Sequence, residues 1–135
     1  MLTRSQLLRM PARDYMNAEQ LAFFRNRLLK MRAEALEDIQ ATRDHLRETE
    51  RATDELDRAV LEGEYALEIR LQEREATLVR KIDEALRRIK DGSYGYCKAT
   101  GEPIGLKRLL ARPTATLSIE AKERAEARER VLRDE

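Results

Sequence analysis

The chain has 135 residues, the length of one domain or of one domain with a long appendage. Charged residues make up 39% of it and aromatic residues only 4%, a composition typical of long solvated helices rather than of a thick core. With 27 Lys and Arg against 26 Asp and Glu the net charge is +1, which excludes an overall field that draws the chain onto nucleic acid or membrane and leaves only local patches to do so.

The sequence also bears on the cellular compartment. It contains neither an apolar run long enough to span a membrane nor a charged and then apolar leader with a small-residue cleavage site, so we expect a cytoplasmic protein. The single cysteine, Cys97, excludes an intramolecular disulfide and fits a reducing compartment.

The first strong structural signal is a helix start at Asn17. Residues 1–16 show no long period, and we expect them to be a loosely held lead-in. Asn17 stands three positions before Gln20, as in a capping box, with Met16 and Leu21 at the positions of a hydrophobic staple. Apolar or small residues then recur at spacings of three and four, which is typical of a coiled-coil arm. They are Leu21, Phe24, Leu28, Met31, Ala35, Ile39, Thr42, Leu46 and Thr49.

This seam stops at residues 47–58, RETERATDELDR, where Leu56 is the only large apolar residue. A second arm follows and ends at Asp91-Gly92, because Gly accepts a positive φ just past a helix C-terminus. Its seam consists of Tyr65, Ile69, Gln72, Ala76, Val79, Ile82, Leu86 and Ile89, with Leu67, Leu71 and Leu78 widening it on one flank. The pattern predicts a coiled-coil hairpin over residues 17–91 with its tip at 53–59.

The alternative to a hairpin is a single helix that runs through the tip and pairs in parallel with a second chain. No Gly or Pro lies between Pro11 and Gly63, so breaker residues do not exclude it. Periodicity favours the hairpin, and we expect a monomer with a mass near 15.7 kDa, whereas the parallel dimer would have twice that mass.

The character of the chain changes at residues 92–117, which hold four of the five glycines and two of the three prolines. This composition predicts a compact, turn-rich module with two short strands, at Tyr94–Lys98 and Glu102–Leu106.

The last predicted element is a helix over residues 118–135. Ser118 is placed as its N-cap, Glu120 lies in its first turn, and its charges alternate in sign. The predicted fold is thus mostly α: a long antiparallel coiled-coil hairpin, a small globular module and a C-terminal helix.

Taken in chain order, a hairpin with the tip DELDRA, then YGYC, then EPIGLKRLLARPTA and a final helix of mixed charge resembles the DksA family of bacterial transcription factors. The resemblance runs from Asp14 to about Val131, and the IGLKRLLARPTA stretch is too long for chance agreement. The tip of that family has the form Asp-x-x-Asp-x-Ala, which Asp54, Asp57 and Ala59 match.

One departure from the family concerns zinc. Its module usually holds a structural zinc with two Cys-x-x-Cys pairs, whereas the matching positions here are Cys97, Thr100, Ser118 and Ala121. Neutral hydroxyls are poor zinc ligands, Ala is none and the lone His45 belongs to the first arm, so we predict a degenerate zinc finger without zinc. Packing must then replace what zinc supplies in small zinc-finger peptides, roughly 10 to 16 kcal/mol. The side chains expected to do so are Ile104, Leu106, Leu109, Leu117 and Ile119.

The sequence does not indicate an enzyme. A single thiol such as Cys97 in a glycine-rich turn is more often a small packed residue than a catalytic group, and no acid-base partner lies near it in the chain. No P-loop, Ser-His-Asp pattern or metalloprotease motif occurs.

The resemblance implies a role for the tip. On their own, Asp54 and Asp57 read as solvated turn residues, one of them capping the second helix. The family inserts its coiled coil into the secondary channel of RNA polymerase, where the tip acids act near the active centre without cutting a bond. Exposed carboxylates on a stiff arm can bias the polymerase by binding one of its conformations better than another.

The resemblance also implies a site for the alarmone ppGpp. The matching residues are Leu78 and Lys81 near the base of the second arm, Arg112 after the basic run, and Lys122 in the final helix. Three cations suit two pyrophosphates, because Arg binds phosphate in a bidentate fork and Lys as a point charge. Without the family they read as ordinary surface charges.

The expected function is a zinc-independent regulator that binds RNA polymerase, works with ppGpp in the stringent response and inhibits stable-RNA promoters. One alternative is a Gre-like transcript cleavage factor, although such chains continue into a larger β-rich domain. The other is a structural coiled-coil adaptor. We expect no direct sequence-specific DNA binding, because the basic run at 107–112 is short and the last helix balances its charges.

Overall fold

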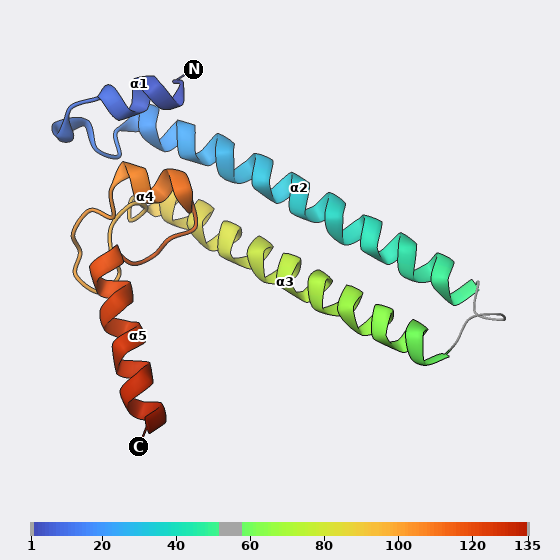
Figure 1. The fold of residues 1–135 in the computed structure, drawn as a ribbon. Coiled ribbons are helices and arrows are strands. Elements are labelled where there is room, and N and C mark those ends of the chain that lie inside the picture. Colours follow the sequence, from blue (N-terminus) through green and yellow to red (C-terminus); the bar gives the residue numbers. More distant parts are fainter. Residues whose placement is uncertain (1, 52–57, 135) are drawn as a thin grey trace. The chain divides into compact units, whose positions relative to one another are not determined.

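The structure, a computed structural model, describes residues 2–51 and 58–134 (Figure 1). Its elements in chain order are α1 (Arg4–Arg9), the 3-10 helix η1 (Ala12–Asp14), α2 (Ala18–Arg51), α3 (Arg58–Asp91), α4 (Leu106–Ala111) and α5 (Ile119–Asp134). Every named element of the described residues is helical, which confirms the mostly α class. Within those residues we find no helix of the length and apolarity that a membrane span requires.

The chain divides into two compact units. The base unit consists of Met1–Leu28 and Ala85–Glu135, and the hairpin unit consists of Leu29–Glu84. The predicted domain boundaries at residues 16 and 91 stay a prediction, since the compact units divide both α2 and α3 between them.

In the hairpin unit, α2 and α3 run antiparallel and pack against each other (Figure 1). Arg32 Nε lies 2.8 Å from Asp83 Oδ1, and farther along the arms His45 Nδ1 contacts a carboxylate oxygen of Glu68. The predicted seam residues from Met31 to Thr49 are all buried or half-buried, which confirms the hairpin over the single through-running helix. The second arm begins its buried face earlier than expected, at Leu61, while Tyr65 is 38% exposed.

The predicted helix ends follow from local hydrogen bonds. The Asn17 side chain accepts from the Gln20 N–H at 2.9 Å, and the Gln20 side chain accepts from the Met16 N–H, one residue before the position expected for a capping box. At the end of α3, Gly92 has φ +86°. The Ser118 hydroxyl accepts from the Ala121 N–H at the start of α5. All three predicted helix boundaries are therefore confirmed.

The expectation of a loosely held lead-in is wrong for residues 2–16. Thr3 and Gln6 form a reciprocal capping box at the start of α1, and Leu7 is completely buried. Beyond η1, the Tyr15 hydroxyl donates to the Gly95 carbonyl at 2.6 Å and accepts from the Gly105 N–H at 2.9 Å. These partners lie 80 and 90 residues away along the chain, so no local pattern could reveal the attachment.

The two predicted strands of the module are also wrong. Among the described residues, β structure is limited to one isolated antiparallel bridge between Tyr96 and Pro103. Leu106, the expected end of the second strand, instead begins α4 after Gly105, whose φ is +102°. Two turns with positive φ, at Gly101 and Gly105, leave too little extended chain between them for a ladder.

The core of the base unit joins segments from the whole chain. Phe24 and Tyr94 pack with ring centroids 5.7 Å apart, and Tyr94 donates a buried hydrogen bond to the Pro113 carbonyl. Leu109 is fully buried, as predicted, whereas Ile119 is 54% exposed and does not hold the module. Leu7, Tyr94, Leu110 and Ala115 are among the buried side chains of the base unit that the sequence did not indicate as core.

Candidate functional site

The predicted tip falls largely outside the described residues. Asp54 and Asp57 both lie in the range 52–57, which the structure does not describe. Ala59 lies in the first turn of α3, which begins at Arg58. The role of these three residues therefore stays a prediction that depends on the family's motif.

The residues predicted to bind ppGpp form two pairs, one in each unit. In the hairpin unit, Leu78 is half-buried and Lys81 is exposed, three residues apart on one face of α3. In the base unit, Arg112 is exposed and caps the C-terminus of α4, donating its N–H to the Arg108 carbonyl. Lys122 of α5 is half-buried, with Nζ 3.8 Å from Glu126 Oε1. Both lysines and Arg112 thus present cations that phosphate can use.

The degenerate zinc positions do come together around the one thiol. Cys97 is 2% exposed, and its sulfur receives hydrogen bonds from the Thr100 hydroxyl and from the backbone N–H groups of Ser118, Thr100 and Ala99. Ala121, the fourth position, is buried and supplies only a methyl group. The described residues contain no group of three or more His, Cys, Asp or Glu able to hold a metal. This donor set does not fit zinc, because one thiolate leaves three of four positions without a nitrogen or sulfur ligand.

The same hydrogen bonds set the acidity of the thiol. Burial by itself raises the pKa of Cys97, but the Thr100 hydroxyl and the three N–H groups favour the thiolate and lower the pKa from 9.0 to about 6. These donors therefore favour the charged form of the thiol at the position where the matched family description has a zinc ligand. The sequence identified the four positions but not the backbone donors, because a backbone N–H group is the same in almost every residue type.

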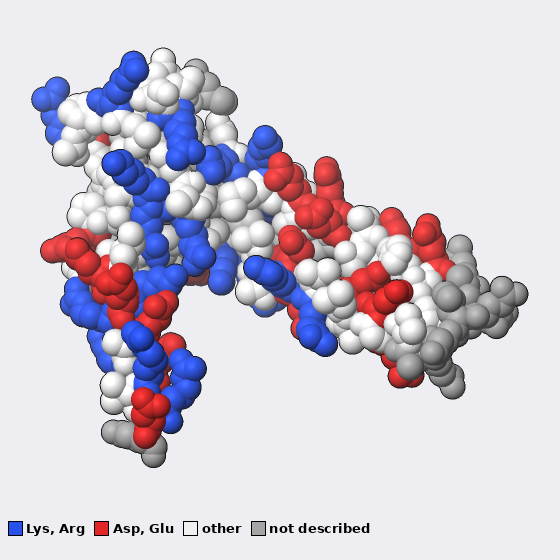
Figure 2. Space-filling view, in the orientation of Figure 1, with Lys and Arg blue, Asp and Glu red and all other residues white. Residues whose placement is uncertain are grey.

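The net charge of the chain is close to zero because the base unit and the hairpin unit carry net charges of opposite sign. The base unit carries 17 Lys and Arg against 10 Asp and Glu, while the hairpin unit carries 10 against 16. Their net charges are therefore +7 and −6. Figure 2 shows the difference on the face in view, with red side chains prominent along the hairpin and blue ones spread over the base unit. Composition alone missed this, because the two excesses nearly cancel.

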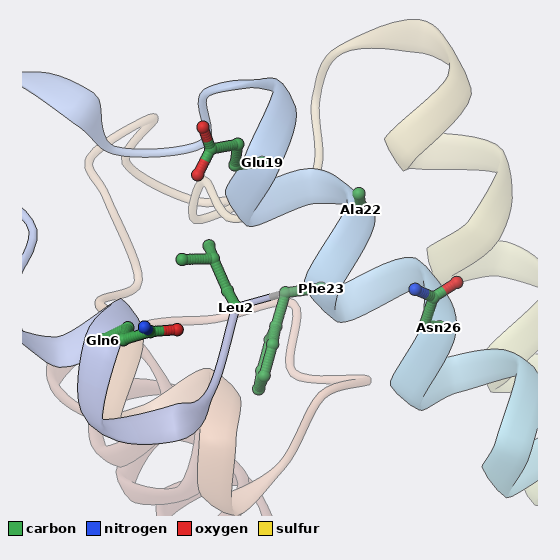
Figure 3. A pocket seen from close by; sticks show the side chains of 6 residues that line it. All are labelled: Leu2, Gln6, Glu19, Ala22, Phe23 and Asn26. Atoms are coloured by element: carbon green, nitrogen blue, oxygen red, sulfur yellow. The ribbon is translucent and has the colours of Figure 1, made fainter.

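A cavity of about 680 Å³ lies between α1 and the first turns of α2. Leu2 and Phe23 supply its apolar wall, and Glu19 is its one charged residue (Figure 3). The other lining residues are Gln6, Ala22 and Asn26. None of the predicted site residues that the structure describes lines it.

Comparison with known protein families accounts for most of the chain. Residues 20–89 match the family described as "DnaK suppressor protein DksA, N-terminal domain". Residues 92–127 match the "Prokaryotic dksA/traR C4-type zinc finger", although this chain retains only one of the four cysteines in that description.

Individual relatives agree over nearly the full length. The "RNA polymerase-binding transcription factor DksA" of Caulobacter vibrioides is 54% identical over 128 residues, covering 93% of this chain and 90% of the relative. The protein of the same name from Escherichia coli K12 is 41% identical over 123 residues, covering 90% and 82%.

A solved structure shares the fold as well. Transcription factor DksA2 from Pseudomonas aeruginosa superimposes with a TM-score of 0.88 at 52% identity, covering 95% of this chain and 99% of that one. These relatives are named as transcription factors and not as enzymes. Since both family descriptions match in chain order and relatives above half identity span nearly the whole sequence, the chain belongs to the DksA family of non-enzymatic transcription regulators.

Proposed function

We propose that this protein binds bacterial RNA polymerase through the secondary channel and, together with ppGpp, modulates transcription initiation without needing zinc. The observation that carries the proposal is the 54% identity, over 93% of the chain, to a relative named as an RNA polymerase-binding transcription factor. In this proposal the protein is a cytoplasmic monomer that inhibits stable-RNA promoters in the stringent response.

The hairpin unit is the part proposed to enter the channel. Two helices joined by the Arg32–Asp83 and His45–Glu68 pairs make a stiff arm, and its excess of six negative charges suits basic groups on a partner. Asp54, Asp57 and Ala59 match the tip motif of the family, and the two acids are proposed to act on the polymerase from there. The acids favour one conformation of the polymerase over another, so the effect requires no bond cleavage by this protein.

The proposed ppGpp site uses Leu78, Lys81, Arg112 and Lys122. Arg112 is exposed and keeps its guanidinium available for a bidentate phosphate contact. The only ion pair described for Lys122 is a contact at 3.8 Å on one helix, which phosphate can displace at little cost because such exposed pairs contribute roughly 0.3 to 0.5 kcal/mol.

Zinc independence is supported by the donor set around Cys97. Thr100 and backbone N–H groups donate hydrogen bonds to the Cys97 sulfur. The buried side chains of Leu109, Leu110 and Tyr94 form a core that can stabilise the module without a metal. A regulator built in this way keeps its fold when zinc is scarce, because no thiolate set has to be metallated.

The experiment that tests the function is in vitro transcription from a ribosomal-RNA promoter by bacterial RNA polymerase, with and without ppGpp. The protein is treated with a zinc chelator that is then removed. Inhibition that deepens when ppGpp is added supports the proposal, and its persistence after chelation supports zinc independence. Absence of any effect from folded protein contradicts the proposal and favours the structural adaptor.

The tip is tested by Asp57→Asn, which removes a charge with little change in volume. We expect polymerase binding to stay within about twofold, because the rest of the arm is unchanged, while inhibition is lost. Glu64→Gln, an exposed change on the hairpin shaft, is the matched control and should keep inhibition. Loss of binding by Asp57→Asn equal to its loss of inhibition contradicts the assignment.

The effector site is tested by Lys122→Ala, with Arg130→Ala on the exposed part of α5 as its control. Only Lys122→Ala should cancel the ppGpp enhancement, and it should spare the inhibition seen without ppGpp. An unchanged ppGpp response in that variant refutes the assignment. Stimulation of transcript cleavage in either assay would instead favour the Gre-like alternative.

A further inference from the structure

The base unit carries more positive charge than the proposed ppGpp site uses. Outside α5, residues 1–28 and 85–118 hold 12 Lys and Arg against 4 Asp and Glu. Figure 2 shows these basic side chains spread over the face of the unit in view, with the acidic ones gathered mainly along α5. An excess of this size on a small unit is the electrostatic footprint of a surface that meets a polyanion.

At least half of these twelve cations are exposed and take part in no ion pair within the described residues. We call six of them the basic surface, and all six are exposed: Arg4, Arg9, Arg13, Arg25, Lys107 and Arg112. Arg112 alone among these six also belongs to the proposed ppGpp site. In the described part of the chain none of the six takes part in an ion pair. Arg27 and Arg108 differ, because they donate to the Leu110 and Leu117 carbonyls and so stabilise the fold.

The surroundings of the basic surface point to nucleic acid rather than to an acidic protein. A stable protein interface needs an apolar centre. In the described base unit outside α5, Leu8, at 42%, is the single large hydrophobic side chain that is strongly exposed. Arginines that surround no apolar centre suit phosphate oxygens, which accept charge-assisted, forked hydrogen bonds.

The same surface lacks the means to read unpaired bases or a base sequence. The aromatic rings of the base unit are buried or half-buried, so none offers an open stacking platform for single strands. The basic residues lie on short helices, on a loop and on the first turns of α2, and not along one long helix able to enter a groove. Once base stacking and groove reading are excluded, the mode of binding that is left is contact with the phosphates of a duplex.

We propose that the basic surface of the base unit binds the phosphate backbone of duplex nucleic acid without sequence preference. The binding is electrostatic, so it weakens steeply with salt as condensed counterions return to the duplex. It adds a contact that requires neither the tip nor ppGpp, and it is compatible with the expected lack of sequence-specific DNA binding.

The test uses the isolated full chain and a fluorescently labelled duplex of about 30 base pairs of arbitrary sequence, followed by anisotropy between about 50 and 200 mM salt. The test variant is Arg4→Gln, Arg9→Gln and Arg13→Gln combined. Its matched control is Arg43→Gln, Arg70→Gln and Arg74→Gln combined, which removes the same charge from exposed positions of the hairpin unit. Circular dichroism checks that both variants remain folded.

We expect the base-unit variant to bind at least about tenfold more weakly at low salt, with a salt dependence shallower by roughly 2 to 3 in the slope of log K against log salt. The control should bind within about twofold of the unmodified protein, because its three arginines are not part of the basic surface. Failure of the unmodified protein to bind at about 50 mM salt overturns the proposal, as does equal weakening in both variants.

An acidic partner is separated by competition. If polyglutamate displaces the labelled duplex as well as unlabelled duplex does at equal charge, the surface recognises carboxylates and the proposal is wrong. No polymerase or ppGpp is present in these measurements, so their outcome is independent of the proposed regulatory function.

Discussion

Leu109 offers the most direct test of how the module holds together without zinc. Its side chain is fully buried in α4, next to the buried Leu110. Truncating a buried Leu to Ala removes transfer free energy and leaves a cavity, at a cost of about 2 to 5 kcal/mol. Because α4 has only six residues and loops on both sides, it can partly collapse onto the cavity, so we expect a loss of about 3 kcal/mol for Leu109→Ala.

The loss is large against a typical domain stability of about 5 to 15 kcal/mol, and a urea titration measures it directly. With an m-value of about 1 to 3 kcal/mol per molar, the unfolding midpoint should fall by about 1 to 3 M urea. Near-ultraviolet circular dichroism of tyrosine reports mainly on unfolding of the base unit, which contains Leu109. Three of the four tyrosines, Tyr15, Tyr94 and Tyr96, lie in this unit, and Tyr65 lies in the hairpin unit.

Two comparisons make the result decisive. Leu36→Ala, at a side chain that is 42% exposed in the hairpin unit, should change the free energy of unfolding by no more than about 0.5 kcal/mol. A zinc chelator should leave the midpoint of the unmodified protein unchanged. A chelator-induced drop in that midpoint, or a change below about 1 kcal/mol in Leu109→Ala, would refute the view that packing replaces zinc.

Three further predictions concern the same unit. Hydrogen bonds lower the pKa of Cys97 from 9.0 to about 6, so between these pH values the unfolded chain binds more protons than the folded chain. The free energy of unfolding should therefore rise with pH across this window. Urea midpoints measured at the two ends of the window should show this rise in the unmodified protein and its loss in Cys97→Ser. Gly95→Ala should cost more than about 1 kcal/mol by thermal unfolding, since φ is +90° and the added Cβ would lie 2.7 Å from Met16 Sδ; a neutral result contradicts the described approach. Tyr94→Phe should lose about 1 to 3 kcal/mol in the same assay, because the buried Pro113 carbonyl loses its donor, and an unchanged melting temperature would show that water replaces it.

Spacing in the sequence was sufficient for the long elements. Residues three and four apart share a helix face, so the recurrence of apolar positions predicts the two arms wherever they later pack. The capping side chains of Asn17 and Ser118 act on N–H groups three residues away, and Gly92 acts through its own φ. Such signals are local and can be read before the fold is known.

The small module could not be read in this way. Turn-rich composition suggested two strands, whereas the chain forms one bridge and the short α4, and the lead-in is held by Tyr15 through atoms of Gly95 and Gly105. Those contacts join residues 80 and 90 positions apart, so their free energy appears only when the chain has closed on itself.

For the candidate site, residue identities alone were enough to assign the motif positions of the family, including Asp54, Asp57 and the solitary Cys97. The tertiary structure alone decided what surrounds that thiol and where the charges gather. Residue types are countable in a sequence, but backbone donors around a sulfur, and the segregation of +7 and −6 between two units, depend on which segments fold together. The net charge of +1 is the sum of these two values and does not show that they belong to different units.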